Sequence, residues 1–290
     1  AFPDNQMPAR LYLILALALF SVSTTSLVIR YLAAVPAVVM AFWRMFTASG
    51  LLWGYSALQP AGRLSNKNRF HIILAGLFLG GHFACFFAGV RLTTIANATL
   101  LGNVAPVFTA LLERLHGQAW NRVTILGLIL SLAGAVIIQG GGLTSPENTA
   151  GNGLALLSSL FMALAWIQAK TIRKNTHTVV YSRHLFLIAA GTILLVVFLA
   201  GYSPFDFERQ HLPWFLFLGL VPSVLGHNLL NYAVRFISST AVASVVLGEP
   251  ILASFFGFIL FQEAMPPASL IGGPMIIIGL YYILSNQSPD

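Results

Sequence analysis

The stretches AGVRLTTIANATLLGNVAPVFTALL at residues 88–112 and YAVRFISSTAVASVVLGEPILASFF at residues 232–256 repeat one another. Within them, three pairs of residues match at a constant offset of 144: Val90 with Val234, Arg91 with Arg235 and Pro106 with Pro250. On either side, four further pairs match at an offset of 145: Gly81 with Gly226, His82 with His227, Gly127 with Gly272 and Gly134 with Gly279. The chain therefore consists of two related halves, whose expected bounds are residues 1–145 and 146–290.

The composition places both halves in a lipid bilayer. Of the 290 residues, 57% are hydrophobic and only 8% are charged, and the mean hydropathy is +0.83. Soluble domains carry about one-quarter charged residues. A soluble enzyme, a nucleic-acid-binding module or a disordered scaffold could not keep this much apolar surface away from water. The net charge of +7 is therefore interpreted as a signal of membrane orientation.

Ten apolar segments have the roughly 20 residues that are needed to cross a hydrocarbon core of about 30 Å. They show no period-two alternation of the barrel type, and every backbone amide at membrane depth needs an internal partner, so they are expected to be α-helices. The expected bounds are 11–30, 35–57, 70–90, 93–112, 122–141, 151–170, 179–200, 212–234, 239–261 and 267–285. The predicted fold class is an all-α membrane protein with ten transmembrane helices.

The positions of Lys and Arg predict the orientation of these helices. With the N-terminus in the cytoplasm, eleven of the fifteen basic residues fall on the cytoplasmic side, three fall outside and Arg44 lies within a span. Because positive loops mark the cytoplasmic side, both termini are expected to be cytoplasmic in a plasma (inner) membrane. Each half has five helices, so the second half is expected to be inverted relative to the first. Arg91 then lies outside and its mate Arg235 inside.

Inverted repeats related by an axis in the membrane plane are typical of transporters, whose substrate sites lie near the midplane. The stretches SVSTTSLVIRYLAAVPAVVMAFWR at residues 21–44 and LGEPILASFFGFILFQE at residues 247–263 resemble the EamA-type proteins of the drug/metabolite transporter superfamily. So do the central prolines of the fourth and ninth segments, and the resemblance covers nearly the whole chain. It implies transport of a small molecule, as in members that export amino acids, drugs or other metabolites.

Ionisable residues at membrane depth are costly to insert and are candidates for function. Arg44 is expected either to fasten a helix junction through backbone carbonyls or to contact an anionic group of the substrate. Glu249 precedes Pro250, which removes one backbone donor and leaves the carbonyl of Val246 available. Glu249 is a candidate for carrying a coupled proton. The alternative is a structural carboxylate, hydrogen-bonded to a neighbouring helix or paired with Arg44.

The matched histidines His82 and His227 occupy equivalent places in the two halves. A lone buried histidine is usually a satisfied core residue, but two at symmetric positions of an inverted repeat are expected to share a midplane site. Asn103 and Asn231 belong to polar stripes at helical spacing on the fourth and eighth segments, and both are expected to face the cavity. Three aromatic residues are also expected to line it: Trp43, Trp166 and Tyr232.

Motifs of other functional classes are missing from the sequence. There is no Gly-rich loop followed by Lys-Ser/Thr, no HExxH and no GxSxG, so neither an enzyme nor a cofactor is predicted. Cys85 is the single cysteine. It can form neither a disulfide within the chain nor a thiolate cluster, and no metal site is predicted.

The predicted function is secondary active transport: export of a small metabolite, amino-acid-like or amphiphilic and drug-like, by alternating access around a midplane cavity. A proton is the candidate coupling ion. The alternative is a passive channel or facilitator for small solutes. The expected partners are the small-molecule substrate and the lipid bilayer, without nucleic acid. The sequence is compatible with both a monomer and a homodimer.

Overall fold

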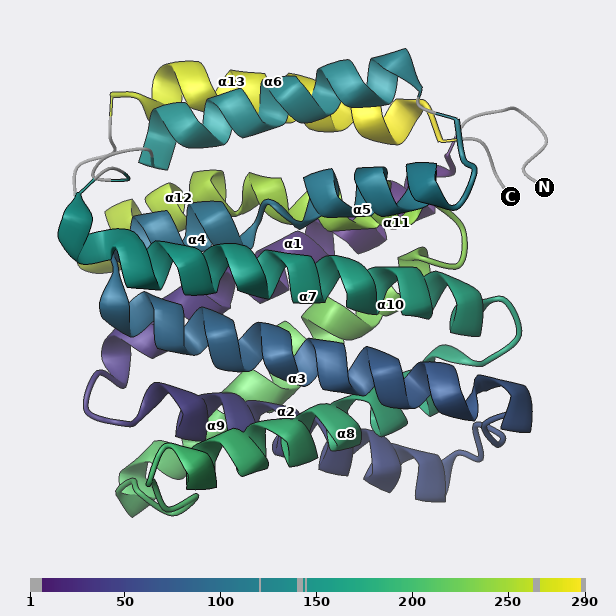
Figure 1. Ribbon diagram of the computed structural model, residues 1–290, viewed down its shortest axis with the longest axis vertical. Helices are drawn as coiled ribbons and strands as arrows, with labels where there is room; N and C mark the ends of the chain where they lie inside the picture. The colour runs from purple at the N-terminus through teal and green to yellow at the C-terminus, as the bar shows by residue number, and fades with distance from the viewer. Residues whose placement is uncertain (1–6, 120, 140–142, 144, 263–266, 288–290) are drawn as a thin grey trace.

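The computed structural model describes residues 7–119, 121–139, 143, 145–262 and 267–287. Every regular element within these ranges is a helix (Figure 1). The first half contains α1 (Ala9–Tyr31), α2 (Ala37–Leu58), α3 (Arg69–Leu92), α4 (Ile95–Gly102), α5 (Ala105–Leu115) and α6 (Arg122–Gln139). The second half contains α7 (Thr149–Arg173), α8 (Thr178–Leu199), α9 (Leu212–Leu218), α10 (Asn228–Ala233), α11 (Ser239–Val245), α12 (Glu249–Phe261) and α13 (Ser269–Ser285). Shorter elements are the 3₁₀ turns η1 (Asn66–Asn68), η2 (Pro146–Asn148), η3 (Arg209–His211) and η5 (Val246–Gly248), and the π-helix η4 (Gly219–His227).

These elements form ten helical segments, which confirms the predicted fold class. Among the described residues, nine segments are long and apolar enough to span a membrane, and the tenth is α13. Its 17 residues rise about 25 Å, and it lies against α6 over most of its length (Figure 1). Lipid-facing side chains such as Leu13, Ile129 and Leu270 are 71%, 60% and 77% exposed, as expected for a bundle whose surrounding solvent is hydrocarbon.

The packing of α6 on α13 shows that the two halves are inverted. A Cβ built on Gly127 would lie 2.5 Å from the carbonyl oxygen of Gly279, and one built on Gly279 would lie 2.5 Å from that of Gly127. Gly134 and Gly272 face one another in the same reciprocal way, also at 2.5 Å. Since Gly127 matches Gly272 and Gly134 matches Gly279, each contact is the symmetry mate of the other. A two-fold axis perpendicular to these antiparallel helices therefore relates the halves, as in inverted-repeat transporters.

The third helix of each half repeats this relationship with the first helix of the other half. Gly81 on α3 packs against Phe161 on α7, and its mate Gly226 in η4 packs against Val22 on α1. These glycines let neighbouring backbones approach closely, which is the usual basis of helix association in membranes.

The fourth and ninth segments are broken near their middles, where the sequence has its central prolines. Pro106 and Pro250 have no N–H, so the carbonyl one helical turn upstream of each loses its intrahelical partner. The fourth segment consequently divides at Asn103 into α4 and α5, and the ninth divides at η5 into α11 and α12. Both breaks lie in the interior of the bundle, where the structure can supply other partners for the freed backbone.

The bundle has two ends, which are distinguished by the chain termini. The beginning of α1 and the end of α13 lie at the same end (Figure 1), here called the terminal end; the opposite end is called the far end. The acidic residue Glu263, which follows the ninth expected segment in the sequence, lies outside the described residues.

Candidate functional site

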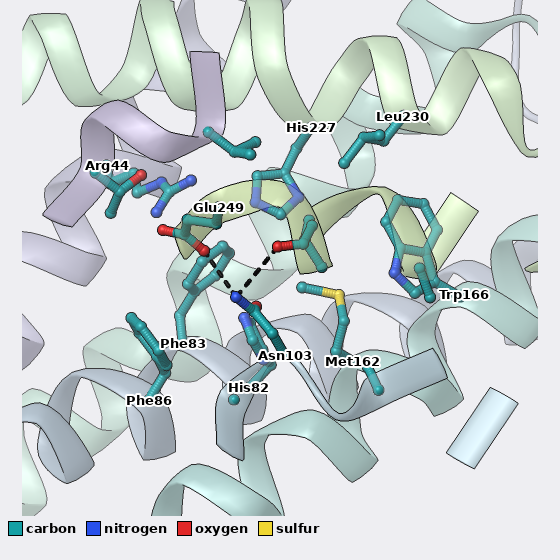
Figure 2. Close-up of a pocket in the computed structure, with 16 residues that line it drawn as sticks. Arg44, His82, Phe83, Phe86, Asn103, Met162, Trp166, His227, Leu230 and Glu249 are labelled. Carbon is teal, nitrogen blue, oxygen red and sulfur yellow. Dashed lines mark hydrogen bonds between the residues drawn. The ribbon is translucent and has the colours of Figure 1, made fainter. Parts of the chain in front are cut away.

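A cavity lies between the two halves and takes residues from the first four helical segments of the first half and from three of the second (Figure 2). The space between these residues that protein atoms do not fill is about 590 Å³, including the part that is open to solvent. The first half contributes Val22, Thr25, Arg44, His82, Phe83, Phe86, Gly102, Asn103 and Ala105. The second half contributes Met162, Trp166, His227, Leu230, Ala243, Val246 and Glu249. This is the place between repeats at which inverted-repeat transporters bind their substrates.

Glu249 and Asn103 meet where the two broken helices cross. Asn103 Nδ2 donates a hydrogen bond to Glu249 Oε2 at 2.8 Å and a longer one to the carbonyl oxygen of Val246 at 3.4 Å (Figure 2). The Val246 carbonyl is the one that Pro250 leaves without its helical donor. Asn103 thus supplies a hydrogen-bond donor to the freed carbonyl of the ninth segment and holds one carboxylate oxygen of Glu249 in place. Both side chains are only partly buried, and both border the cavity.

Arg44 on α2 is almost completely buried, with 2% of its surface exposed. Its Nε donates a hydrogen bond to Ser223 Oγ at 3.0 Å, and its guanidinium lies 4.5 Å from the centre of the Phe83 ring. Nη2 is buried and has no hydrogen-bond partner among the described residues. Figure 2 shows the guanidinium directed toward Glu249. The predicted fastening to backbone carbonyls is therefore not the arrangement observed, and one donor of a buried cation is left for a ligand.

Thr25 on α1 supplies a second polar group to the same cavity. Its side chain is buried, with 6% exposed, and within the described part of the chain Oγ1 has no hydrogen-bond partner. Buried polar atoms without partners are rare because each costs about 1–3 kcal/mol. The cavity thus contains two such atoms, one on Thr25 and one on Arg44.

His82 and His227 both line the cavity, with Phe83 between them. The ring centroids lie 4.7 Å apart for His82 and Phe83 and 5.5 Å apart for Phe83 and His227. His82 Nδ1 is 2.9 Å from the carbonyl oxygen of Ser158. A carbonyl can only accept, so Nδ1 carries the proton, and the Nε2 of a neutral His82 is an acceptor.

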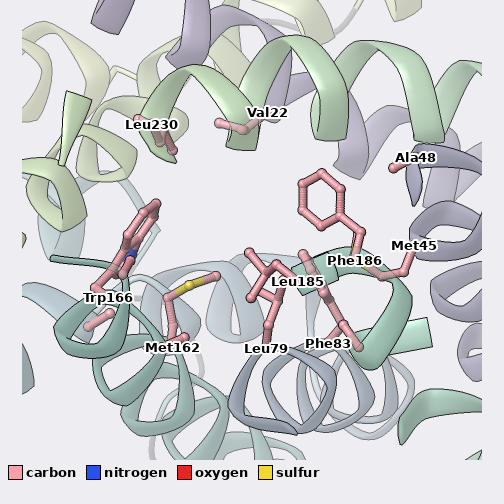
Figure 3. Close-up of a cluster of buried hydrophobic side chains, with 14 of the residues drawn as sticks. Val22, Met45, Ala48, Leu79, Phe83, Met162, Trp166, Leu185, Phe186 and Leu230 are labelled. Carbon is pink, nitrogen blue, oxygen red and sulfur yellow. The ribbon is translucent and has the colours of Figure 1, made fainter. Parts of the chain in front are cut away.

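Apolar side chains form the remaining wall. Trp166 and Met162 on α7 are buried and border the cavity from the second half, and Phe83 and Phe86 border it from the first. Phe83, Met162 and Trp166 also belong to the hydrophobic core between the halves (Figure 3). The cavity therefore combines a polar part, with both charge signs, and an aromatic part.

The structure places Asn231 beside this cavity. The π-helix η4 has a wider turn than an α-helix, so Ser223, His227 and Asn231 do not form the single stripe that α-helical spacing predicts. Ser223 turns toward Arg44, while Asn231 Nδ2 donates to Ser182 Oγ on α8 at 3.1 Å. Asn231 borders a small adjoining pocket that also touches His227 and Trp166.

Trp43 and Tyr232 are not brought to the cavity. The Trp43 indole N–H donates to the carbonyl oxygen of Pro204 at 2.7 Å, and its ring stacks on Phe215 with centroids 5.9 Å apart. Trp43 thus belongs to an aromatic cluster under the loop at the far end. Tyr232 contacts Phe236, with ring centroids 5.0 Å apart, near the terminal end. Trp43 precedes Arg44 in the sequence, and Tyr232 follows Asn231. Because adjacent side chains of a helix point about 100° apart, Trp43 and Tyr232 face away from the cavity that their neighbours approach.

Glu113 connects the two halves, and the sequence did not single it out. Its carboxylate accepts hydrogen bonds from the backbone N–H of Ser239 at 2.7 Å and from Thr240 Oγ1 at 2.6 Å. It thus joins the end of α5 to the beginning of α11 at the terminal end, across the two halves. The residues are more than 120 positions apart, and nothing in a single sequence links them. Thr25 was not predicted to line the cavity either, although its helical spacing from Ser21 is a signal that could have found it.

The described residues contain no group of three or more His, Cys, Asp or Glu side chains that could hold a metal ion.

Comparison with known proteins agrees with this architecture. The EamA-like transporter family matches residues 9–140 and again residues 149–285. A protein of Archaeoglobus fulgidus that is described as an uncharacterized transporter is 29% identical over 261 residues, which are 86% of this chain and 88% of that protein. The pseudopaline exporter CntI of Pseudomonas aeruginosa strain UCBPP-PA14 is 25% identical over 274 residues, which are 92% and 93% of the two chains.

A solved crystal structure has the same fold, with a TM-score of 0.80 at 19% identity and coverage of 96% of this chain and 98% of that one. The two family matches together span nearly the entire chain, one in each half. They agree with the helical bundle, and with transport of a small molecule across a membrane as opposed to enzymatic catalysis. The chain belongs to the EamA-like transporter family.

Proposed function

We propose that this protein is a secondary active exporter whose substrate is a small zwitterionic or amphiphilic molecule with a carboxylate. The observation that carries the proposal is the pair of buried atoms without partners, Arg44 Nη2 and Thr25 Oγ1, that border a cavity between two inverted repeats. A carboxylate of the substrate satisfies both atoms. Its hydrogen bond to the guanidinium is charge-assisted and among the strong ones.

The rest of the cavity suits the other parts of such a molecule. An ammonium group of the substrate finds its counter-charge in Glu249, whose second carboxylate oxygen is not taken by Asn103. An apolar side chain finds Trp166, Met162 and Phe86. Recognition by a mostly apolar wall with a few placed polar groups is typical of small-molecule sites.

Proton coupling is proposed to operate through Glu249. The groups that face it are Arg44 on α2, Asn103 at the break of the fourth segment, and the two cavity histidines on α3 and η4. A proton and the cationic end of the substrate both neutralise this carboxylate, so they compete for it. If the carrier changes conformation only when Glu249 is neutralised, inward movement of a proton is exchanged for outward movement of substrate.

Alternating access is supported by an asymmetry between the two ends of the bundle. At the terminal end α5 packs closely against α11, and Glu113 bonds the two. The symmetry mates of these elements, α4 and α12 toward the far end, form no comparably close packing among the described residues. Exchange of the two packings opens one end and closes the other. With the terminal end in the cytoplasm, as the basic residues predict, this conformation faces outward.

The two five-helix repeats, with proposed bounds 1–145 and 146–290, are the bodies that exchange these packings. The relative named as a pseudopaline exporter supports outward transport. A passive channel is the second candidate, but a passive pore does not require close packing between the two halves at one end of the bundle and an open counterpart at the other end.

Growth inhibition identifies the substrate and tests export. Cells with and without the protein are grown in inhibitory concentrations of amino acids, short peptides, nucleosides and cationic drugs. The proposal expects raised tolerance of compounds that carry a carboxylate, and loss of that tolerance in Arg44→Gln. Tolerance restricted to cationic drugs without a carboxylate, unaffected by Arg44→Gln, would contradict it.

A further inference from the structure

A second cavity lies at the terminal end, between the end of α2, the loop that follows it, and the beginnings of α3 and α8. It is an open cavity, and the space in it that protein atoms do not fill is about 1040 Å³, including the part that is open to the surroundings. Three arginines border it, namely Arg63 in the loop, Arg69 on α3 and Arg183 on α8, together with Trp53. It is separate from the central cavity and shares none of its lining residues.

Arg183 is held in a fixed position in this cavity. Its side chain is 7% exposed, its Nη2 donates to the carbonyl oxygen of Gly62 at 3.0 Å, and its guanidinium lies 4.3 Å from the centre of the Trp53 ring. Its Nε is buried and has no hydrogen-bond partner among the residues that the structure describes. The ring and the loop carbonyl thus orient a buried cation that still has a donor to offer.

No carboxylate of the described residues borders the cavity to balance the three positive charges. The sequence has no Asp or Glu between Asp4 and Glu113 or between Glu147 and Asp206, and these two stretches contain the three arginines. The charge must therefore be balanced from outside the chain. Arginine forks match the oxygens of phosphate particularly well.

The wall of the cavity that α3 and α8 form is apolar and exposed to lipid. Ile73 on α3 is 48% exposed, and one turn further along the same helix Leu77 is 45% exposed. Ile188 on α8 completes this wall, where α3 and α8 run side by side (Figure 1). Trp53 lies in the last turns of α2, which ends at Leu58, where a tryptophan at the membrane interface is expected. A molecule that fits has a phosphate at the interface and a hydrocarbon tail along α3 and α8.

We propose that this cavity binds an anionic phospholipid, with the headgroup phosphate held by Arg63, Arg69 and Arg183 and one acyl chain lying along Ile73 and Ile188. Basic pockets between helices near the membrane surface recognise lipid headgroups in this way. Arg183 lies on the second helix of the second half, as Arg44 lies on the second helix of the first. The second helix thus presents an arginine to the central cavity in one half and to this cavity in the other.

The test uses the purified full chain in an uncharged detergent. Native mass spectrometry and thermal unfolding are measured with phosphatidylglycerol, with phosphatidylcholine of the same acyl chains, and with millimolar inorganic phosphate. We expect phosphatidylglycerol to stay bound and to raise the Tm, and phosphatidylcholine and inorganic phosphate to do neither. Equal effects of the two lipids, or a full effect of inorganic phosphate alone, would overturn the proposal.

Variants locate the bound lipid. Arg63→Gln combined with Arg69→Gln changes only exposed side chains, and its affinity for phosphatidylglycerol should be about 25-fold weaker. Lys67→Gln, in the same loop but outside the cavity, is the matched control and should bind like the wild type. A double variant that binds as tightly as Lys67→Gln would place the lipid elsewhere and contradict the assignment.

Discussion

Asn103 donates a hydrogen bond of 2.8 Å to Glu249, although the two residues belong to different repeats and lie 146 positions apart. The same amide group reaches the Val246 carbonyl that Pro250 leaves free. One side chain of the broken fourth segment thus completes the broken ninth segment and orients its carboxylate. If the fourth segment moves relative to the ninth, this hydrogen bond changes. The charge state of Glu249 is therefore expected to depend on the conformation of the protein.

Glu249→Gln is expected to remove the pH dependence of transport. Glutamine can still accept the hydrogen bond from Asn103, so the variant should fold, but it cannot exchange a proton. In the wild type, protons compete with the cationic end of the substrate, so apparent affinity should fall as pH falls on the binding side. In Glu249→Gln it should stay flat. The exposed Glu147→Gln is the control, and an unchanged pH profile in Glu249→Gln would return the carboxylate to a structural role.

Arg44→Gln is expected to weaken substrate binding about 10- to 100-fold, because a hydrogen bond to a charged group contributes about 1.5–3 kcal/mol. Competition against the best compound from the growth screen measures this. An amide or ester derivative without the carboxylate should bind the wild type and the variant equally. Arg114→Gln, an exposed arginine on α5, controls for general loss of charge. A variant that loses both compounds to the same extent would speak against a carboxylate contact.

The two cavity histidines are expected to respond differently. His82→Ala removes the hydrogen bond that Nδ1 donates to the carbonyl of Ser158 and should lower the free energy of unfolding by about 0.5–1.5 kcal/mol. His82→Asn, whose amide can replace Nδ1, should recover much of it. His227→Ala should alter competition among substrates with little change in thermal stability. Loss of stability with an unaltered substrate profile in both alanine variants would contradict a substrate site shared by His82 and His227.

Glu113→Ala is expected to loosen the closure at the terminal end, since it removes the acceptor for Ser239 N–H and Thr240 Oγ1. A cysteine at cavity-lining Ala243, in a Cys85→Ser background, should react faster with an impermeant maleimide applied to inside-out vesicles. The adjacent Arg114→Ala should not accelerate the reaction. Equal rates in Glu113→Ala and the parent would show that this carboxylate does not contribute to closure.

Cysteine labelling also tests the orientation. In the same background, Ser203→Cys in the exposed loop at the far end should react in intact cells, whereas Lys67→Cys at the terminal end should react only after the membrane is opened. The reverse pattern would place both termini outside. It would also change the direction assigned to the present conformation.

The fold followed from the sequence because its strongest constraints are local. Apolar length defines the spans, and Pro106 and Pro250 predict the breaks through their missing donors. The repeat also predicts that the second half is inverted, because an odd number of helices in the first half makes the second half start from the opposite side of the membrane. The wide turn of η4 was not predicted, since the missing donor of Pro222 indicates a disturbed helix but does not distinguish a break from a π-helical turn.

The candidate site was predictable in part, for the same reason. Symmetry between His82 and His227 and the placement of Glu249 and Arg44 within spans identified residues that the cavity brings together. Helical spacing could not fix the direction of Trp43 or Tyr232, because small rotations of a helix redirect its side chains. The contacts of Glu113 with Thr240 and of Arg44 with Ser223 depend on how distant segments pack. No local pattern records that packing.

The most direct test of proton-coupled export is transport against a gradient in proteoliposomes that contain the purified protein. The compound from the growth screen is supplied at equal concentration inside and outside the vesicles. A pH gradient is then imposed with the lumen more acidic than the external solution. The account predicts accumulation above the external concentration, abolished by Glu249→Gln. Equalisation without accumulation, identical in the wild type and Glu249→Gln, would show a passive facilitator and contradict it.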